Sequence, residues 1–258
     1  MRPETRPGHD AERRRVVGRV LDSGPFALRL EAPGFPAHAP GQFAMLQLDP
    51  GLERVDPLLP RPMAVYRREG DALEFRFRPV GRGTRIMGSL APGEAVAVVG
   101  PLGRGFRLPE GAALLVGGGT GIASLYELAR DSSGPLRVAL GAATQAELLG
   151  LEDFRALDCE LSVSTEDGSA GRKGRVTDGL GIRPGESVYA CGPNGMLRAV
   201  AALAEEARAP CSVSLESTMA CGFGICLGCV VPVRDGFRYL CTQGPVLDAG
   251  ELCWEDLP

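Results

Sequence analysis

The segment Cys221-Gly222-Phe223-Gly224-Ile225-Cys226-Leu227-Gly228-Cys229 carries three cysteines at the spacing Cys-x4-Cys-x2-Cys, and Cys241 and Cys253 follow it. This spacing with a later fourth cysteine is that of plant-type 2Fe-2S ferredoxins, in which four thiolates bind two irons. Glycines separate the cysteines, as a loop requires that adopts unusual φ/ψ values and brings backbone N–H groups close to sulfur. The segment therefore predicts a 2Fe-2S site whose first three ligands are these cysteines.

Other interpretations of the cysteines stay open from spacing alone. A zinc site more often shows two short cysteine pairs, and ordinary buried cysteines would have no reason to share this spacing and glycine content. The fourth ligand is either Cys241 or Cys253, and Cys253 beside Trp254 could instead be a packed terminal thiol. Three further cysteines lie in or beside apolar runs, where a plain buried thiol is expected: Cys159, Cys191 and Cys211.

The composition excludes several other classes of protein. Of the 258 residues 44% are hydrophobic, which is ample for buried cores, and the formal net charge of -4 offers no basic field for nucleic acid. The N-terminus is polar, and no apolar run approaches the ~18 residues of a membrane span. We therefore expect a cytosolic protein, in which cysteines stay reduced. With only His9 and His38 present, a histidine-based metal site or catalytic triad is nearly excluded.

The first part of the chain, residues 1–108, has the pattern of short β-strands. The runs 15–20, 26–30 and 73–78 alternate polar and apolar residues, and glycine or proline turns separate them. Closely spaced strands without a long helical pattern predict a small antiparallel β-barrel.

Residues 109–210 change to an alternation of strands and helices. The apolar run 112–116 meets the glycine turn Gly117-Gly118-Gly119-Thr120-Gly121 and then a helical pattern at 122–129. Further strands are expected at 137–140, 160–164 and 187–190, with helices near 145–157 and 194–208. Such an alternation predicts a parallel sheet in an α/β domain. Residues 211–258 are then expected to be a small cluster-binding appendage, of a length at which metal often substitutes for a core.

The glycine turn is a candidate nucleotide site. It offers backbone N–H groups and a helix N-terminus to an anion such as a pyrophosphate, which points to Gly118, Gly119, Thr120 and Gly121. The full Gly-x-Gly-x-x-Gly pattern is absent because Ser124 stands at its last position, and a tight structural turn would explain several of these glycines too.

Two further segments bear on the nucleotide. The residues 141–144, near the end of the next strand, include no Arg or Lys to meet a 2'-phosphate, which favours NAD over NADP. Arg172 and Lys173 in a separate loop moderate that preference. Cys191-Gly192-Pro193 ends another expected strand, which places it at the carboxyl edge of the sheet where open α/β folds bind ligands. It could equally be a turn and the start of a helix.

Several segments together resemble the ferredoxin-reductase family, in which a flavin-binding barrel precedes a nicotinamide-nucleotide domain. They follow the family's order along the chain: Arg61-Pro62-Met63-Ala64-Val65, Gly81-Arg82-Gly83-Thr84, Gly100-Pro101-Leu102-Gly103-Arg104-Gly105-Phe106, the glycine turn and Cys191-Gly192-Pro193. The ending, 215–229 followed by 241–246, most resembles the electron-transfer subunits of NAD-dependent dihydroorotate dehydrogenase B. The resemblance covers nearly the whole chain.

The resemblance implies a bound FAD. In the family an Arg-Pro-x-Ser stretch binds it, with the arginine on the phosphates, and Arg61 suits that role as a fixed charge with a fork of donors. Ala64 stands at the serine position, which removes one hydroxyl contact to the flavin. A tight turn and a half-buried strand would also explain the later segments. The implied FAD contacts are Arg61, Pro62, Met63, Ala64, Arg76, Phe77, Arg78, Gly83 and Thr84.

The resemblance also selects the fourth cluster ligand. Cys241, rather than Cys253, precedes the Gly-Pro-Val that follows the family's fourth cysteine. The implied ligand set is Cys221, Cys226, Cys229 and Cys241.

The function that the resemblance implies is electron transfer in pyrimidine biosynthesis. Electrons taken from dihydroorotate by the FMN of a separate catalytic subunit would pass through the 2Fe-2S cluster and FAD to NAD+, within a heterotetramer. The cofactors perform the redox chemistry, so this chain needs no acid-base residue of its own. A related subunit of a hydrogenase or of a ferredoxin-linked transhydrogenase would share the architecture, and a non-catalytic iron-sulfur redox-sensing module is an alternative of another class.

Overall fold

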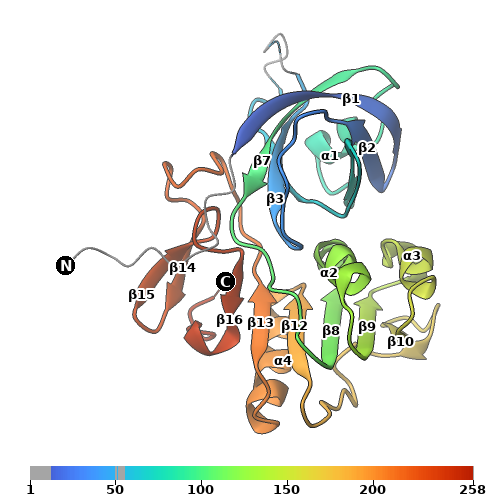
Figure 1. Ribbon diagram of the computed structural model, residues 1–258, viewed down its shortest axis with the longest axis vertical. Coiled ribbons are helices and arrows are strands. Elements are labelled where there is room, and N and C mark those ends of the chain that lie inside the picture. Colours follow the sequence, from blue (N-terminus) through green and yellow to red (C-terminus); the bar gives the residue numbers. More distant parts are fainter. Residues whose placement is uncertain (1–12, 50, 52–55, 258) are drawn as a thin grey trace.

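The first part of the chain folds into a curled sheet of seven strands (Figure 1). The structure is a computed structural model that describes residues 13–49, 51 and 56–257. The strand order is β4-β3-β7-β1-β2-β6-β5, and every neighbouring pair is antiparallel. The strands are β1 (Arg14–Gly24), β2 (Ala27–Glu31), β3 (Phe43–Gln47), β4 (Arg61–Ala64), β5 (Arg67–Glu69), β6 (Ala72–Arg76) and β7 (Ala95–Leu102). The predicted antiparallel barrel is confirmed as a half-barrel.

Alternating burial explains these strands. In β2, Leu28 and Leu30 are fully buried while Arg29 between them is not, so one face of the strand lies on the core and the other faces outward. The core inside the curled sheet also contains Phe75, Val96 and Val98, all fully buried. Each pair of inward residues two positions apart thus fixes the register of its strand.

One short helix interrupts the strands where the sequence indicated a tight turn. Helix α1 (Arg82–Met87) begins after Gly81, whose backbone N–H donates to Thr84 Oγ1 at 3.1 Å. Met87 at the other end is fully buried in the core of the curled sheet. The hydrogen bond satisfies a backbone donor that precedes the helix, and the buried methionine anchors its end.

The second sheet is the predicted parallel one. Its order is β11-β10-β9-β8-β12-β13-β16, with parallel pairing throughout except between β13 and β16. Its strands are β8 (Ala113–Gly118), β9 (Leu136–Ala142), β10 (Glu160–Thr165), β11 (Arg172–Lys173), β12 (Ser187–Cys191), β13 (Cys211–Ser214) and β16 (Val246–Asp248). The central strand β8 is buried along its whole length, as a parallel strand covered on both faces requires.

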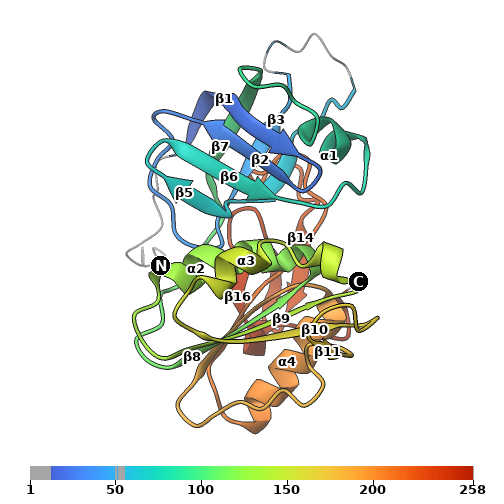
Figure 2. The same ribbon diagram turned by 90° about the vertical axis from the view of Figure 1, so that its right-hand side faces the viewer.

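Helices cover the two faces of this sheet. Helix α4 (Asn194–Glu206) packs Leu197 and Val200 against one face, whereas α2 (Tyr126–Asp131) and α3 (Leu151–Arg155) pack on the other. Figure 2 shows α2 and α3 between the second sheet and the curled sheet. Within the described residues no helix is long and apolar enough to cross a membrane.

The predicted helix near 145–157 is broken into two short pieces. A 3-10 turn covers Gln145–Glu147, and α3 begins only after Gly150, whose φ is +69°. A Cβ atom at Gly150 would overlap the hydroxyl of Tyr66, which lies between β4 and β5 of the curled sheet. The break therefore permits a close contact between the first and second parts of the chain.

The C-terminal segment is tied into the rest of the molecule. Its hairpin, β14 (Val230–Val233) with β15 (Gly236–Tyr239), follows the cysteine loop, and β16 returns to the edge of the second sheet. Cys229, Val231 and Leu240 share one core with Met45 of the curled sheet and Val213 of the second. The expected appendage thus has a common core with both sheets. The boundaries 1–108, 109–210 and 211–258 stay a prediction, and the last of them falls at the first residue of β13.

Candidate functional site

A cavity of about 340 Å³, here called the first cavity, is lined by residues of both sheets and of the C-terminal segment. It brings together seven of the nine predicted FAD contacts: Pro62, Met63, Ala64, Arg76, Phe77, Arg78 and Thr84. The remaining two, Arg61 and Gly83, lie directly against each other, because a Cβ atom at Gly83 would overlap the guanidinium of Arg61. Glycine at this position lets the arginine lie over the first turn of α1.

The walls of the first cavity fit the flavin that the resemblance implies. Most of its lining is apolar, as a planar aromatic ring system requires, and a few polar side chains stand among the apolar ones. Ser217, which lines the cavity, has a buried hydroxyl with no hydrogen-bond partner among the described residues. A buried hydroxyl normally has a hydrogen-bond partner, so a polar ligand in this cavity would supply the partner that the Ser217 hydroxyl lacks.

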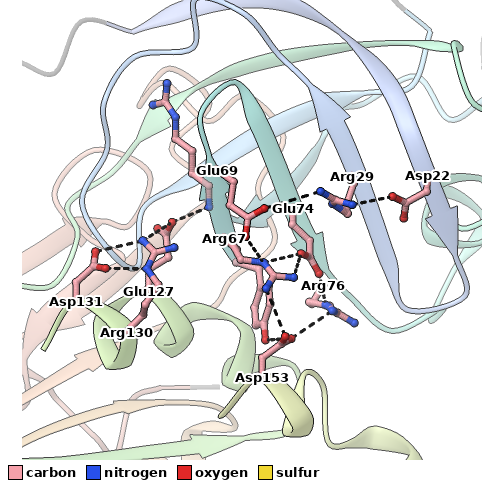
Figure 3. A network of polar contacts seen from close by, with 12 residues as sticks. Asp22, Arg29, Arg67, Glu69, Glu74, Arg76, Glu127, Arg130, Asp131 and Asp153 are labelled. Atoms are coloured by element: carbon pink, nitrogen blue, oxygen red, sulfur yellow. Dashed lines mark hydrogen bonds and ion pairs between the residues drawn. The ribbon is translucent and has the colours of Figure 1, made fainter. Parts of the chain in front are cut away.

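A polar network fixes the arginines beside the first cavity (Figure 3). Glu74 is almost fully buried; it accepts a hydrogen bond from Arg67 Nη2 at 2.6 Å and forms an ion pair with Arg76 Nε, also at 2.6 Å. Asp153 of α3 lies 3.4 Å from each of the same two arginines. The network therefore connects β5 and β6 to the second part of the chain, and it holds Arg76 in a defined position at the cavity wall.

Tyr66 completes this junction. Its hydroxyl donates to Asp153 Oδ2 at 2.6 Å, and its ring stacks on that of Tyr126 with 4.6 Å between the centroids. Burial, followed by the hydrogen bond to Asp153, raises the pKa of the Tyr66 hydroxyl well above its usual value. Tyr66 therefore remains a neutral donor, and sequence reasoning did not identify it.

A second cavity, of about 460 Å³, lies at the carboxyl edge of the second sheet. Gly118 and Gly119 of the glycine turn and Pro193 line it, together with Gly195 and Met196 at the start of α4. A helix N-terminus and the carboxyl edge of a parallel sheet are both favourable places for the phosphates of a nucleotide.

The other predicted nucleotide contacts lie outside the second cavity. Thr120 lines the first cavity, whereas Gly121, Cys191 and Gly192 pack against one another, because a Cβ at Gly121 would overlap the backbone of Cys191. Burial raises the pKa of the Cys191 thiol to about 12. These three residues bring the glycine turn close to the end of β12 and do not line either cavity.

Charged residues that the sequence reasoning missed also line the second cavity. Glu166 directly follows β10, and Arg175 lies in the loop after β11. Glu147 forms a 2.7 Å ion pair with Arg78, which lines both cavities. The position of Glu166 just beyond a parallel strand is a signal that could have identified it from the sequence. Arg172 and Lys173 form β11 and do not line the cavity.

The four predicted cluster ligands lie in two pairs. Cys229 Sγ lies 3.2 Å from Cys241 Sγ, and the Cys226 thiol and backbone N–H both hydrogen-bond to Cys221 Sγ. Among the described residues no three His, Cys, Asp or Glu side chains converge to hold one metal ion. Two pairs of thiols suit a two-iron cluster, in which each iron takes two cysteines.

Backbone N–H groups are directed at these sulfurs. Phe223 and Cys226 donate to Cys221 Sγ at 3.4 and 3.5 Å, and Gly224 donates to Cys241 Sγ at 3.1 Å. The N–H groups of Cys226 and Phe223 lower the pKa of the Cys221 thiol to about 6. Such donors stabilise thiolate sulfur, so the loop fits the cluster that its spacing predicts.

The cysteine loop, residues 221–229, is here called the thiol loop, and it reaches the protein surface. Cys226 is exposed, whereas Cys229 and Cys241 are buried. Apolar side chains of the thiol loop and of the β14–β15 hairpin that follows it are also exposed and are here called the loop patch: Phe223, Ile225, Leu227, Val230 and Phe237. Ile225 has 79% of its surface exposed, which is unusual for a large apolar residue. Clustered exposed apolar side chains mark interaction surfaces.

Comparison with known proteins places the chain in one group of relatives. Residues 216–253 match the family model of the iron-sulfur cluster binding domain of dihydroorotate dehydrogenase B. The electron transfer subunit of dihydroorotate dehydrogenase B (NAD(+)) from Caldanaerobacter subterraneus is 38% identical over 92% of this chain and 96% of its own length. The corresponding subunit from Bacillus caldolyticus is 41% identical over 83% of this chain and 86% of its own.

Solved structures give the same architecture. A chain of the NADH-dependent reduced ferredoxin-NADP oxidoreductase, described in the context of flavin-based electron bifurcation, superposes with a TM-score of 0.79 at 29% identity. The superposition covers 94% of this chain and 90% of that one. The ferredoxin reductase of carbazole 1,9a-dioxygenase shares the fold, with a TM-score of 0.61 at 18% identity over 76% of this chain and 65% of that one.

Proposed function

This chain belongs to the family of electron transfer subunits of NAD-dependent dihydroorotate dehydrogenase B, and we propose that it passes electrons between a dihydroorotate-oxidising catalytic subunit and NAD. FAD and a 2Fe-2S cluster are its carriers, and pyrimidine biosynthesis is the pathway it serves. We propose a cytoplasmic location, because none of the eight cysteines is in a disulfide, as is usual for a protein of a reducing compartment.

The observation that carries this proposal is the order in which the three sites adjoin. Arg78 lines both the second and the first cavity, so a nucleotide in one would lie next to a flavin in the other. Four of the six residues between β13 and Cys221 line the first cavity, and this segment continues directly into the thiol loop. The loop in turn reaches the surface beside the loop patch. The sites therefore form a continuous route from the nucleotide to the surface.

This order matches the chemistry of the cofactors. A flavin exchanges two electrons with a nicotinamide and single electrons with an iron-sulfur cluster, which is why a flavin belongs between the other two. The residues of this chain hold the components in place: Arg76 through its pairs with Glu74 and Asp153, and Thr84 through its bond to Gly81. In the second cavity the negative charge of Glu166 and the neutral residues at the end of β9 favour NAD over NADP, whereas the positive charge of Arg175 in the same lining opposes that preference.

The loop patch supports a partner at the cluster. The exposed apolar residues Ile225 and Leu227 flank the exposed Cys226 in the chain, and desolvated apolar residues form the cores of protein interfaces. We propose that an FMN-containing dihydroorotate dehydrogenase catalytic subunit covers this patch. Two copies of each subunit would form a heterotetramer.

Reconstitution tests the function directly. The purified chain, reconstituted with FAD, iron and sulfide, is expected to show flavin and iron-sulfur absorption, and NADH should bleach both under anaerobic conditions. Addition of the FMN-containing catalytic subunit should produce dihydroorotate-dependent reduction of NAD+. A chain that retains no flavin, or a mixture that oxidises dihydroorotate without reducing NAD+, would contradict the proposal.

A ferredoxin-linked transhydrogenase subunit is the second candidate. It is favoured by the superposition on the NADH-dependent reduced ferredoxin-NADP oxidoreductase, which covers 94% of this chain. The two candidates differ in their partner. Co-purification with an FMN-containing dihydroorotate dehydrogenase subunit supports the first, whereas co-purification with a second flavoprotein that reduces ferredoxin supports the other.

A further inference from the structure

One wall of the first cavity comes from the iron-sulfur segment. Leu215, Glu216, Ser217 and Met219 line the cavity before the first cluster cysteine, and Pro245 lines it after the fourth. The segment therefore contacts the flavin site with both of the arms that hold the thiol loop. None of these residues belongs to the predicted set of FAD contacts.

Two residues that line this cavity carry a buried side-chain atom without a hydrogen-bond partner among the described residues, Arg76 and Ser217, and they differ in charge pairing: Arg76 Nε lies 2.6 Å from the Glu74 carboxylate, whereas the Ser217 hydroxyl has no such neighbour. Thr84 Oγ1 donates to the Gly81 carbonyl at 3.0 Å, and Arg76 and Arg78 are paired with acidic side chains. The hydroxyl of Ser217 is buried and has no hydrogen-bond partner in the described part of the chain. A buried hydroxyl without a partner costs stability, because it gives up its bonds to water and gains none.

We propose that Ser217 hydrogen-bonds the bound flavin, and that the iron-sulfur segment thereby forms part of the flavin site. A serine hydroxyl both donates and accepts, and a flavin ring carries nitrogen and oxygen atoms that can take either role. The inference rests on the proposed function, since it takes the first cavity to be the FAD site. It makes Ser217 a binding residue contributed by the part of the chain that also holds the cluster.

The consequence is a reciprocal coupling between the two cofactor sites. Ser217 lies four residues before Cys221, on a connection with no regular secondary structure. A flavin that bonds Ser217 restricts this connection, and a cluster that fixes Cys221 restricts it from the other end. Each cofactor therefore favours the backbone arrangement that the other requires, and by linkage the effect must be equal in both directions.

The test is the FAD affinity of Ser217→Ala, measured by flavin fluorescence on protein stripped of FAD. The loss of one hydrogen bond should weaken binding about 3- to 10-fold. The FAD-free variant should melt at the wild-type temperature or above it, because the substitution removes an unpaired buried hydroxyl. FAD should then raise its melting temperature less than it raises that of the wild type. Thr218→Ala is the matched control, since Thr218 is exposed and does not line the cavity.

The outcomes separate this inference from the proposed function. Wild-type affinity in Ser217→Ala would overturn the inference while leaving the flavin site in place, and so would an equal loss in Thr218→Ala. A loss confined to Ser217→Ala, with a shifted flavin absorption maximum, is the expected result. A wild-type chain that binds no FAD would instead overturn the proposed function itself.

Discussion

The hydroxyl of Tyr66 donates to Asp153 Oδ2 at 2.6 Å, which joins the curled sheet to α3 of the second part of the chain. Gly150 accommodates this contact, because any side chain there would overlap the Tyr66 hydroxyl. Arg67 and Arg76 approach the same carboxylate from the curled sheet (Figure 3). One acidic side chain thus ties three residues of the first part of the chain to the second part.

Tyr66→Phe should destabilise the protein by about 1 to 2 kcal/mol, because it removes a buried hydrogen bond to a charged group and leaves the ring stacking intact. Urea unfolding of the FAD-loaded protein measures the effect. Tyr239→Phe, which removes the hydroxyl of a half-buried tyrosine in β15, should stay within about 0.5 kcal/mol of the wild type. Equal effects of the two substitutions would show that the Tyr66–Asp153 bond contributes nothing specific.

Much of the architecture could be predicted from local sequence. The cysteine spacing indicates a cluster because its ligands lie close together in the chain, and the alternating patterns at 26–30 and 73–78 indicate strands because burial alternates along each strand. The glycine turn identifies the join between β8 and the following 3-10 helix (Gly119–Leu125) in the same way.

Features that depend on distant residues could not be predicted. The break at Gly150 is explained only by Tyr66, which lies 84 positions earlier in the sequence. Cys191 was expected at a ligand site, and it is buried instead, because Gly121 packs onto its backbone. The wall that Ser217 adds to the first cavity follows from the course of the chain between β13 and the thiol loop, for which the local sequence has no signal.

The preference for NADH is expected to depend on Glu166. Its carboxylate lines the second cavity just beyond β10, where it would repel the additional 2'-phosphate of NADPH. Glu166→Gln should therefore improve the rate of flavin reduction by NADPH relative to NADH by about 5-fold, the effect of one partly screened charge pair. Stopped-flow reduction with each nucleotide gives this ratio. Glu152→Gln, an exposed change on α3 outside the cavity, should leave the ratio unchanged, and an unchanged ratio in Glu166→Gln would exclude the role.

Docking of the catalytic subunit is expected to depend on Ile225. Its side chain is 79% exposed at the centre of the thiol loop, and a carboxylate there would have to be desolvated in a closed interface. Ile225→Glu should weaken association with the catalytic subunit about 10-fold or more while leaving the flavin and iron-sulfur spectra unaltered. Analytical ultracentrifugation of the mixed subunits measures the association. Leu108→Glu changes a leucine of 50% exposure outside the thiol loop and should have little effect, so comparable losses would argue against docking at the loop.

The order of the carriers can be tested at Cys226. Cys226→Ser removes the one predicted ligand that is exposed, so the cluster should be lost while the buried pair Cys229 and Cys241 keeps its packing in the core. At saturating FAD, NADH should still reduce the flavin within about 2-fold of the wild-type rate, because the second cavity adjoins the first and no residue of the thiol loop lines either cavity. Electron transfer to the catalytic subunit should fall to background, since the route from the flavin to the surface passes through the loop.

Cys253→Ser is the matched control and should retain both the cluster spectrum and full transfer. Equal loss of flavin reduction and of transfer in Cys226→Ser would refute this order of carriers, and loss of the cluster in Cys253→Ser would refute the choice of Cys241 as the fourth ligand.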